Sequence, residues 1–138
     1  MACLLLSAAF AAWTWLRPYD FRPDPAARCE VIETLVTRDQ SFFWVHVHLK
    51  VIPGMRHDLQ IPVTLATANG PKQPADTTFA GTDPLNPEEI WFKFWLDSSD
   101  LAGPLNLELN GGKLSVKAHP HTPDLGSDAF QNFTTNHW

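Results

Sequence analysis

Two stretches in which apolar side chains occupy every second position constrain the fold more than any other feature of the chain. The first alternates Phe43, Val45, Val47, Leu49 and Val51 with Trp44, His46, His48 and Lys50. The second alternates Ile90, Phe92, Phe94 and Leu96 with Trp91, Lys93 and Trp95. Because side chains two apart lie on the same face of a β-strand, each stretch is predicted to be a strand with one face in a hydrophobic core.

Weaker strand signals lie on both sides of these stretches. Cys29–Thr37 is rich in β-branched residues, but its alternation slips at Ile32–Glu33, which predicts a β-bulge or an edge strand. The other expected elements are an inward-facing row of Ile61, Val63 and Leu65, a turn at Asn69–Gly70, a short strand at Thr77–Phe79, a turn over Asp97–Pro104, and a hairpin from Leu105 to Val116 around Asn110–Gly112.

Six or seven short strands, with no helical period after residue 25, predict an all-β fold. About 110 residues follow this point, which is the size of one sandwich domain. We therefore expect an immunoglobulin-like antiparallel β-sandwich over residues 27–118 and an irregular C-terminal tail over 119–138. The two cysteines, Cys3 and Cys29, do not make a disulfide framework, and Cys29 is expected to behave as a small apolar side chain.

The first 16 residues carry no charged side chain and are rich in leucine, alanine and tryptophan. A helix of this length would span ~24 Å, somewhat less than the hydrocarbon thickness of a bilayer. Aromatic and basic residues at its end prefer the lipid headgroup level, which lengthens the effective span. The sequence thus predicts a membrane anchor over residues 1–16, with Trp13, Trp15, Arg17 and Tyr19 at the membrane interface.

Two other interpretations of this segment stay open. Ala9–Ala11 has the small-x-small pattern of a signal-peptide cleavage site, although no Lys or Arg precedes the apolar run. The segment could also be a buried helix of a soluble domain. Residues 17–26 form a proline-rich spacer, for which we expect an extended conformation. Basic residues after the anchor favour a cytoplasmic domain by charge counting, whereas the order of anchor, proline spacer and sandwich favours the periplasmic, extracytoplasmic side.

Part of the chain resembles a known type of domain. The segment "VTLATANG", a proline-rich gap and then "IWFKFWLDSSDLAGPLNLEL" together resemble immunoglobulin-like domains of uncharacterised bacterial exported or membrane-anchored proteins. The resemblance covers roughly Ile61 to Leu109 and its motifs are unspecific. It implies a β-sandwich and no catalytic residues.

Three tryptophans are the strongest candidates for a binding site. If the phenylalanines of the two alternating strands face the core, Trp44, Trp91 and Trp95 face away from it. This much apolar surface is costly to leave in water, and tryptophan is enriched in interface hot spots, which predicts partner binding. In one alternative the tail, with Phe130, Phe133 and Trp138, folds over this face. In another, coplanar indoles stack on a sugar.

A metal site is a further hypothesis. His46 and His48 lie two apart on one strand, so both imidazoles can reach one ion. A zinc site needs at least one more ligand, for which the candidates are His57, Asp58, His119 and His121. The alternative is that both histidines are half-exposed residues opposite the core face.

Composition and missing motifs exclude several classes of function. The net charge of −5, with the basic residues scattered singly, argues against nucleic-acid binding. No nucleotide-binding, hydrolase, zinc-protease or redox motif is present, and paired carboxylates occur only in turns. The sequence therefore predicts a non-catalytic accessory or interaction subunit without a cofactor, which contacts the membrane and another membrane-complex protein. A secreted carbohydrate-binding module is the alternative.

Overall fold

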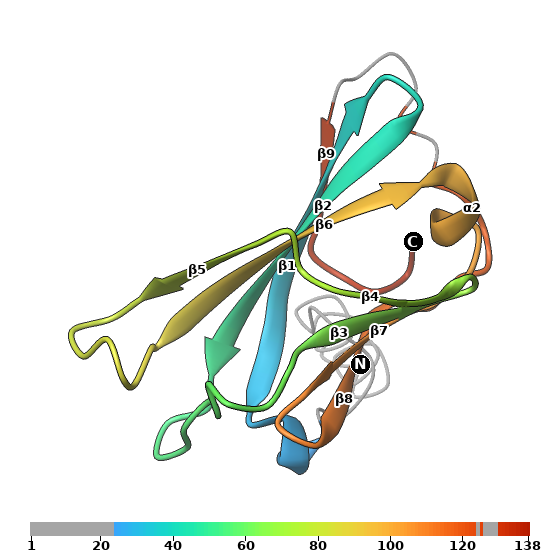
Figure 1. The fold of residues 1–138 in the computed structure, drawn as a ribbon. Helices are drawn as coiled ribbons and strands as arrows, with labels where there is room; N and C mark the ends of the chain where they lie inside the picture. Colours follow the sequence, from blue (N-terminus) through green and yellow to red (C-terminus); the bar gives the residue numbers. More distant parts are fainter. Residues whose placement is uncertain (1–23, 124, 126–129) are drawn as a thin grey trace, which may run out of the picture.

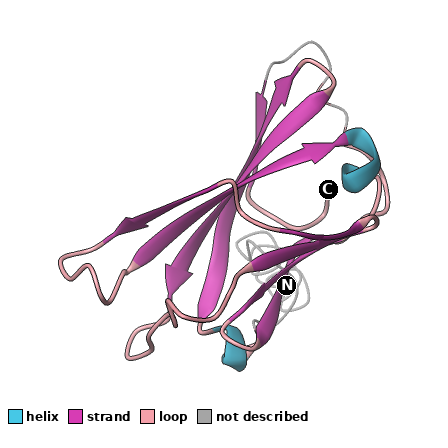
Figure 2. Cartoon of the chain, in the orientation of Figure 1, coloured by secondary structure: helices cyan, strands magenta, loops and turns pink. Residues whose placement is uncertain are grey.

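The computed structural model describes residues 24–123, 125 and 130–138, which form two antiparallel β-sheets with the core between them (Figures 1 and 2). Sheet A has the strand order β5-β6-β2-β1-β9, and sheet B has the order β4-β3-β7-β8. The strands are β1 (Cys29–Asp39), β2 (Phe42–Val51), β3 (Thr64–Thr67), β4 (Gly70–Lys72), β5 (Asp76–Ala80), β6 (Glu89–Asp97), β7 (Leu105–Leu109), β8 (Gly112–Lys117) and β9 (Phe130–Phe133). The all-β, two-sheet prediction is confirmed.

The two alternating stretches form the centre of sheet A. They are β2 and β6, and they pair with each other so that Val45 lies opposite Phe94 and Val47 opposite Phe92. All four of these side chains are buried. Each one contributes roughly 1.5–3 kcal/mol by leaving water. The polar and tryptophan-bearing positions between them point to the outer face, as the alternation requires.

The predicted bulge is present in β1. Val31 pairs with Leu49 and Glu33 pairs with His48, so Ile32 is an extra residue without a partner in the register. The bulge corrects the alternation after this point. As a result Val36 faces the core, while Glu33 lies on the outer face of sheet A.

The hairpin between β7 and β8 anchors sheet B to the start of the domain. Asn110 and Gly111 both have positive φ angles, of 54° and 84°, as a tight hairpin turn requires. The buried Asn110 side chain donates from Nδ2 to the Ala27 carbonyl oxygen (2.6 Å) and accepts from the Asp58 backbone N–H (2.7 Å). One amide therefore joins the hairpin to two segments that are far away in the sequence.

Two parts of the prediction were wrong in detail, and a third was confirmed in its bounds. Ile61 is 38 % exposed, because the chain bends around Pro62 and β3 begins only at Thr64. The predicted turn over Asp97–Pro104 contains a short helix, α2 (Ser98–Leu101), capped by the Asp97 side chain. The tail contains a strand, β9, which pairs with the free edge of β1. The four residues of β9 are too few to show a strand period in the sequence. Their pairing partner, β1, lies about a hundred positions earlier in the chain, so no local pattern indicates the pairing.

The predicted membrane segment 1–16 and the interface residues Trp13, Trp15, Arg17 and Tyr19 lie outside the described residues. Within the part of the chain that is described, no helix has the length and apolar character needed to cross a bilayer. The spacer ends in a short 3₁₀ turn, η1 (Pro25–Ala27), instead of an extended stretch. Asp24 caps this turn by accepting from Ala26 N (3.0 Å), and it also accepts from Lys113 N on β8 (3.1 Å).

Candidate interaction face

The candidate site lies on the outer face of sheet A, where residues of four strands line up in rows. In one row Phe130, Thr37, Trp44 and Trp95 follow one another across β9, β1, β2 and β6. Trp44 and Trp95 are thus direct cross-strand partners. The prediction that the outward-facing tryptophans of the two strands come together holds for this pair.

Four aromatic rings lie along this row on the outer face, three of them in contact with one another. We name the side chains of Phe42, Trp44, Trp95 and Phe130 the aromatic patch. The Trp44 and Trp95 rings lie 4.2 Å apart with their planes inclined by 56°, and Phe42 stacks on Trp95 at 4.9 Å. Phe42, Trp95 and Phe130 are 40 %, 38 % and 61 % exposed, so the patch presents apolar surface to solvent.

Polar neighbours fix the position of Trp44 within the patch. Its indole Nε1 donates to Asp39 Oδ2 (3.3 Å), and the Lys93 ammonium lies 4.2 Å from the centre of its ring. The second contact has the geometry of a cation–π interaction. Trp44 is therefore held at its edge and on one face by contacts within the chain.

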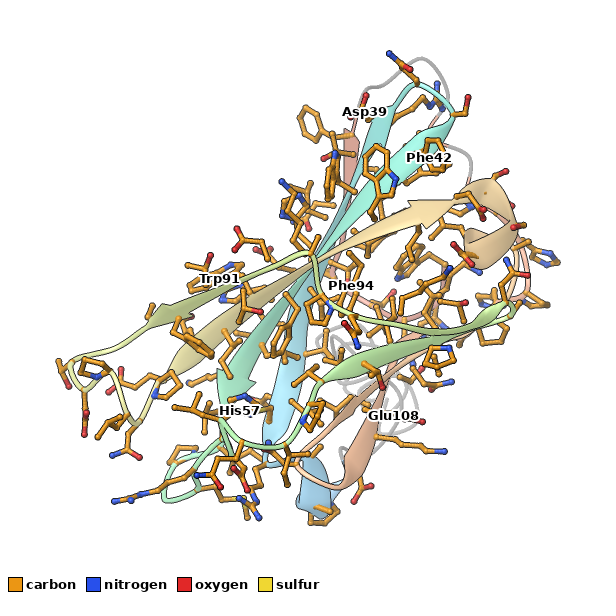
Figure 3. All side chains as sticks on the ribbon, in the orientation of Figure 1. Asp39, Phe42, His57, Trp91, Phe94 and Glu108 are labelled. Carbon is orange, nitrogen blue, oxygen red and sulfur yellow. The ribbon has the colours of Figure 1, made fainter. Side chains whose placement is uncertain are left out.

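Trp91 lies on the same face but outside the aromatic patch. It is the cross-strand partner of His48, and the two rings stack at 4.3 Å with planes 13° apart. A row containing His46 and Lys93 separates this pair from Trp44 and Trp95. Figure 3 shows Phe42 and Trp91 at separate places along the sheet. The three predicted tryptophans therefore form two sites instead of one.

His48 is held between two carboxylates. Its Nδ1 lies 3.4 Å from Glu33 and its Nε2 lies 3.1 Å from Glu89, both on the outer face. Asn132 of β9 also donates to Glu33 (3.0 Å) and lowers the pKa of that carboxyl, with His48 adding to the effect. We name Glu33, His48 and Glu89 the carboxylate–histidine bridge. It links β1, β2 and β6.

The metal hypothesis lacks a third ligand. His46 and His48 do project from the same face, but both ring nitrogens of His48 already face carboxylates. Burial, together with the nearby Lys93 charge, lowers the pKa of His46. Among the described residues no group of three or more His, Cys, Asp or Glu side chains is arranged to hold a metal ion, so His57, Asp58, His119 and His121 do not complete the site.

The alternative in which the tail folds over the tryptophan face agrees only in part with the described residues of the tail. Phe133 packs against the core, and Trp138 is buried in it, with their rings stacked at 4.3 Å. Phe130 instead adds to the exposed aromatic surface. The described part of the tail thus completes the interior and extends the patch.

Sequence reasoning missed Phe42 as a member of the patch and named Phe130 only as a tail residue that could cover this face. Phe42 lies two positions before Trp44, so extending the alternation by one step would have placed it on the outer face. Phe130 carries no such signal, since it reaches the patch only through the pairing of β9 with β1.

Comparisons with protein-family models, with curated proteins and with solved structures find no match for this chain. The face therefore has to be interpreted from its own geometry.

Proposed function

We propose that this chain is a non-catalytic accessory domain that binds a partner protein through the aromatic patch. We further propose that the sandwich is of the immunoglobulin-like kind and is held on the extracytoplasmic side of a membrane by residues 1–16. The size of the domain and its two antiparallel sheets of five and four strands support the immunoglobulin-like sandwich. The apolar composition of the N-terminal segment supports the membrane anchor.

One observation carries the proposal. Phe42 and Trp95 stack on each other and are each at least 38 % exposed, and Phe130 adds a more exposed ring two strands away from Trp44 on the same face of the five-stranded sheet. Scattered exposed apolar residues are normal, whereas a contiguous aromatic group marks an interaction surface. Because the Phe42, Trp44 and Trp95 rings already contact one another, a partner restricts few additional side-chain rotations when it binds.

The ring geometry favours a protein partner over a sugar. A carbohydrate-binding face needs flat indoles that lie open for stacking. Here the Trp44 and Trp95 planes are inclined by 56° and the rings contact each other. Lys93 lies over the Trp44 ring as well. An irregular apolar surface with charges at its rim is the usual anatomy of a protein–protein interface.

The proposal is tested with the full chain, extracted from its native membrane in mild detergent with an affinity tag. Quantitative mass spectrometry compares the wild type with the Phe42→Ala, Trp95→Ala double variant. We expect one membrane protein to co-purify with the wild type, and its recovery to fall about tenfold in the variant, as expected for loss of a hot spot.

Leu85→Ala is the matched control, because Leu85 is a large apolar side chain that is 74 % exposed in the loop between β5 and β6. It should leave recovery of the partner unchanged. Recovery of the chain alone, or equal recovery of the partner with the double variant, would contradict the proposal.

A further inference from the structure

Two carboxylates flank the aromatic patch where β2 begins. Asp39 of β1 and Asp97 of β6 are the two cross-strand partners of Phe42. Directly paired residues project from the same face of a sheet, so the two aspartates stand on either side of Phe42 on the outer face of sheet A. Figure 3 shows Asp39 and Phe42 near each other at the end of the β1–β2 hairpin. The patch therefore has an acidic end.

No positive charge of the described residues balances either carboxylate, since neither takes part in an ion pair there. Asp39 Oδ2 accepts from the Trp44 indole (3.3 Å). Asp97 Oδ1 accepts from the Ser99 hydroxyl (2.6 Å) and from the Asp100 backbone N–H (2.9 Å), and these bonds lower the pKa of Asp97. Neutral donors thus orient both groups and leave their charges uncompensated.

The other end of the patch is basic. The Lys93 ammonium lies 4.2 Å from the centre of the Trp44 ring. Lys93 and Asp97 are four residues apart on β6, a distance of roughly 13 Å along the strand. A partner that binds the patch therefore meets a fixed order of charges, with carboxylates beside Phe42 and an ammonium beside Trp44. Such an order selects both the partner and its orientation.

Phe42 offers ring surface between the two carboxylates. It stacks on Trp95 at 4.9 Å with planes 21° apart, and it is still 40 % exposed. A guanidinium group can lie flat on an aromatic ring while the N–H groups at its edge donate to carboxylates beside the ring. A lysine ammonium is a compact and strongly hydrated charge without a flat surface. Arginine is therefore the side chain that matches the ring and both carboxylates.

We propose that the partner presents an arginine to the acidic end of the patch, with the guanidinium against Phe42 and between Asp39 and Asp97. This inference rests on the proposed function, because it names the chemistry by which that partner is recognised. A second copy of the chain would bring a net charge of −5 and the same uncompensated aspartates to this face. A basic segment of a different protein complements the face better.

N-acetyl-arginine amide and N-acetyl-citrulline amide are suitable probes, because they have nearly the same shape and only the first is positively charged. Each is titrated into the ¹⁵N-labelled full chain in non-ionic detergent micelles. We expect saturable shifts of the Trp44 and Trp95 indole N–H signals and of the Phe42 amide signal. The arginine probe should bind about threefold more tightly than the citrulline probe, as expected for a cation–π contact at an exposed site.

The Asp39→Asn, Asp97→Asn double variant should remove this preference. Asparagine keeps an acceptor for the Trp44 indole and caps a helix as well as aspartate does, so the variant removes the charges and preserves the hydrogen bonds. Asp83→Asn, Glu88→Gln is the matched control, because it removes two charges from exposed residues that precede the opposite end of β6. The control should keep the preference for the arginine probe.

Four results would overturn the proposal. Three of them are absence of saturable shifts, equal binding of the two probes by the wild type, and an unchanged preference in the aspartate variant. The fourth is a shift of the Trp44, Trp95 and Phe42 signals with protein concentration alone, which would assign the face to a second copy.

The co-purification experiment separates this inference from the proposed function. If the Phe42→Ala, Trp95→Ala variant loses the partner while the Asp39→Asn, Asp97→Asn variant keeps it, the patch binds its partner without an arginine between the aspartates. If the Phe42→Ala, Trp95→Ala variant keeps the partner, the proposed function itself fails. Loss of the partner from both variants, with full recovery in the Asp83→Asn, Glu88→Gln control, is the result that we expect.

Discussion

Nε2 of His48 lies 3.1 Å from Oε1 of Glu89, across the pairing of β2 with β6. The other nitrogen of the same ring faces Glu33 on β1, and Trp91 stacks against the ring. A neutral imidazole has one N–H and can donate to only one of the two carboxylates, whereas the imidazolium form donates to both. The bridge therefore ties together three strands most strongly when His48 is charged.

Glu33→Gln should change the acid sensitivity of the domain. The pKa of Glu33 is lowered in the fold, first by the hydrogen bond from Asn132 and then by His48. A lowered pKa means that the carboxylate stabilises the fold above the unfolded-state pKa, near 4.5, and that this contribution is lost as the pH falls through the folded-state value.

Urea unfolding between pH 7 and pH 3 measures this effect. The wild type should lose more stability than Glu33→Gln over the acidic part of the range. Since Glu33 is 40 % exposed, the difference at pH 7 should stay below about 1 kcal/mol. Parallel acid curves for the two proteins would show that the bridge contributes nothing.

Lys117→Met should stabilise the domain at neutral pH. Lys117 is fully buried, and its Nζ donates to the backbone oxygens of Gly103 (3.3 Å) and His119; no ion pair with a carboxylate is found for it among the described residues. Burial lowers its pKa from 10.5 to about 8. Replacing the buried charge with an apolar chain of similar length should add about 1–2 kcal/mol to the free energy of unfolding.

The pH dependence gives an independent check on Lys117. The pKa of Lys117 is lowered in the fold, so its whole destabilising contribution is present below the folded-state pKa, near 8. This contribution disappears as the pH rises towards the unfolded-state pKa, near 10.5. The advantage of Lys117→Met should therefore shrink between these two values in denaturant titrations. A constant advantage across this range would rule out the charge as its source.

Gly112→Ala should destabilise the domain by about 2 kcal/mol through overpacking. A Cβ at this position would lie 2.3 Å from the Ala27 backbone nitrogen and 2.8 Å from the Ala26 carbonyl carbon, so η1 would have to move. Gly111→Ala is the matched control, since a Cβ there meets nothing within 4 Å but the φ of +84° is strained. That strain should cost about 1 kcal/mol. Thermal unfolding compares the two, and an equal loss would refute the close approach of η1 to β8.

Trp138→Ala should destabilise the domain by about 3–5 kcal/mol, as expected for removal of a buried aromatic side chain. Its ring is 8 % exposed and stacks on Phe133. Phe130→Ala, at a 61 % exposed position in the same tail, should change stability by less than about 0.5 kcal/mol. Chemical denaturation that finds similar effects for both variants would contradict the assignment of Trp138 to the core.

The parts of the fold that could be predicted are those whose information is local. The alternation from Phe43 to Val51 and from Ile90 to Leu96 defines two strands and their outer faces, and the slip at Ile32–Glu33 marks the bulge. Only the structure supplies the pairings between distant segments. Trp44 lies opposite Trp95, and β9 lies beside β1, because of sheet order, which no short sequence window contains.

The candidate site divides in the same way. The outward direction of Trp44, Trp91 and Trp95 follows from strand period. The separation of Trp91 from the other two depends on how β2 and β6 are aligned along their length. His57 gave no functional signal beyond its place among the spare metal ligands, since its burial against Phe79 and Phe92 results from contacts between distant segments.

The extra residue in β1 also affects how this chain can change in length. Ile32 stands outside the register, so losing it would leave Val31 inside and Glu33 outside, and the strand would only become straighter. Inserting one residue between Thr34 and Val36 would instead exchange interior and exterior for the rest of the strand. Sequence variants that gain or lose a residue in this strand should therefore do so at the position of Ile32.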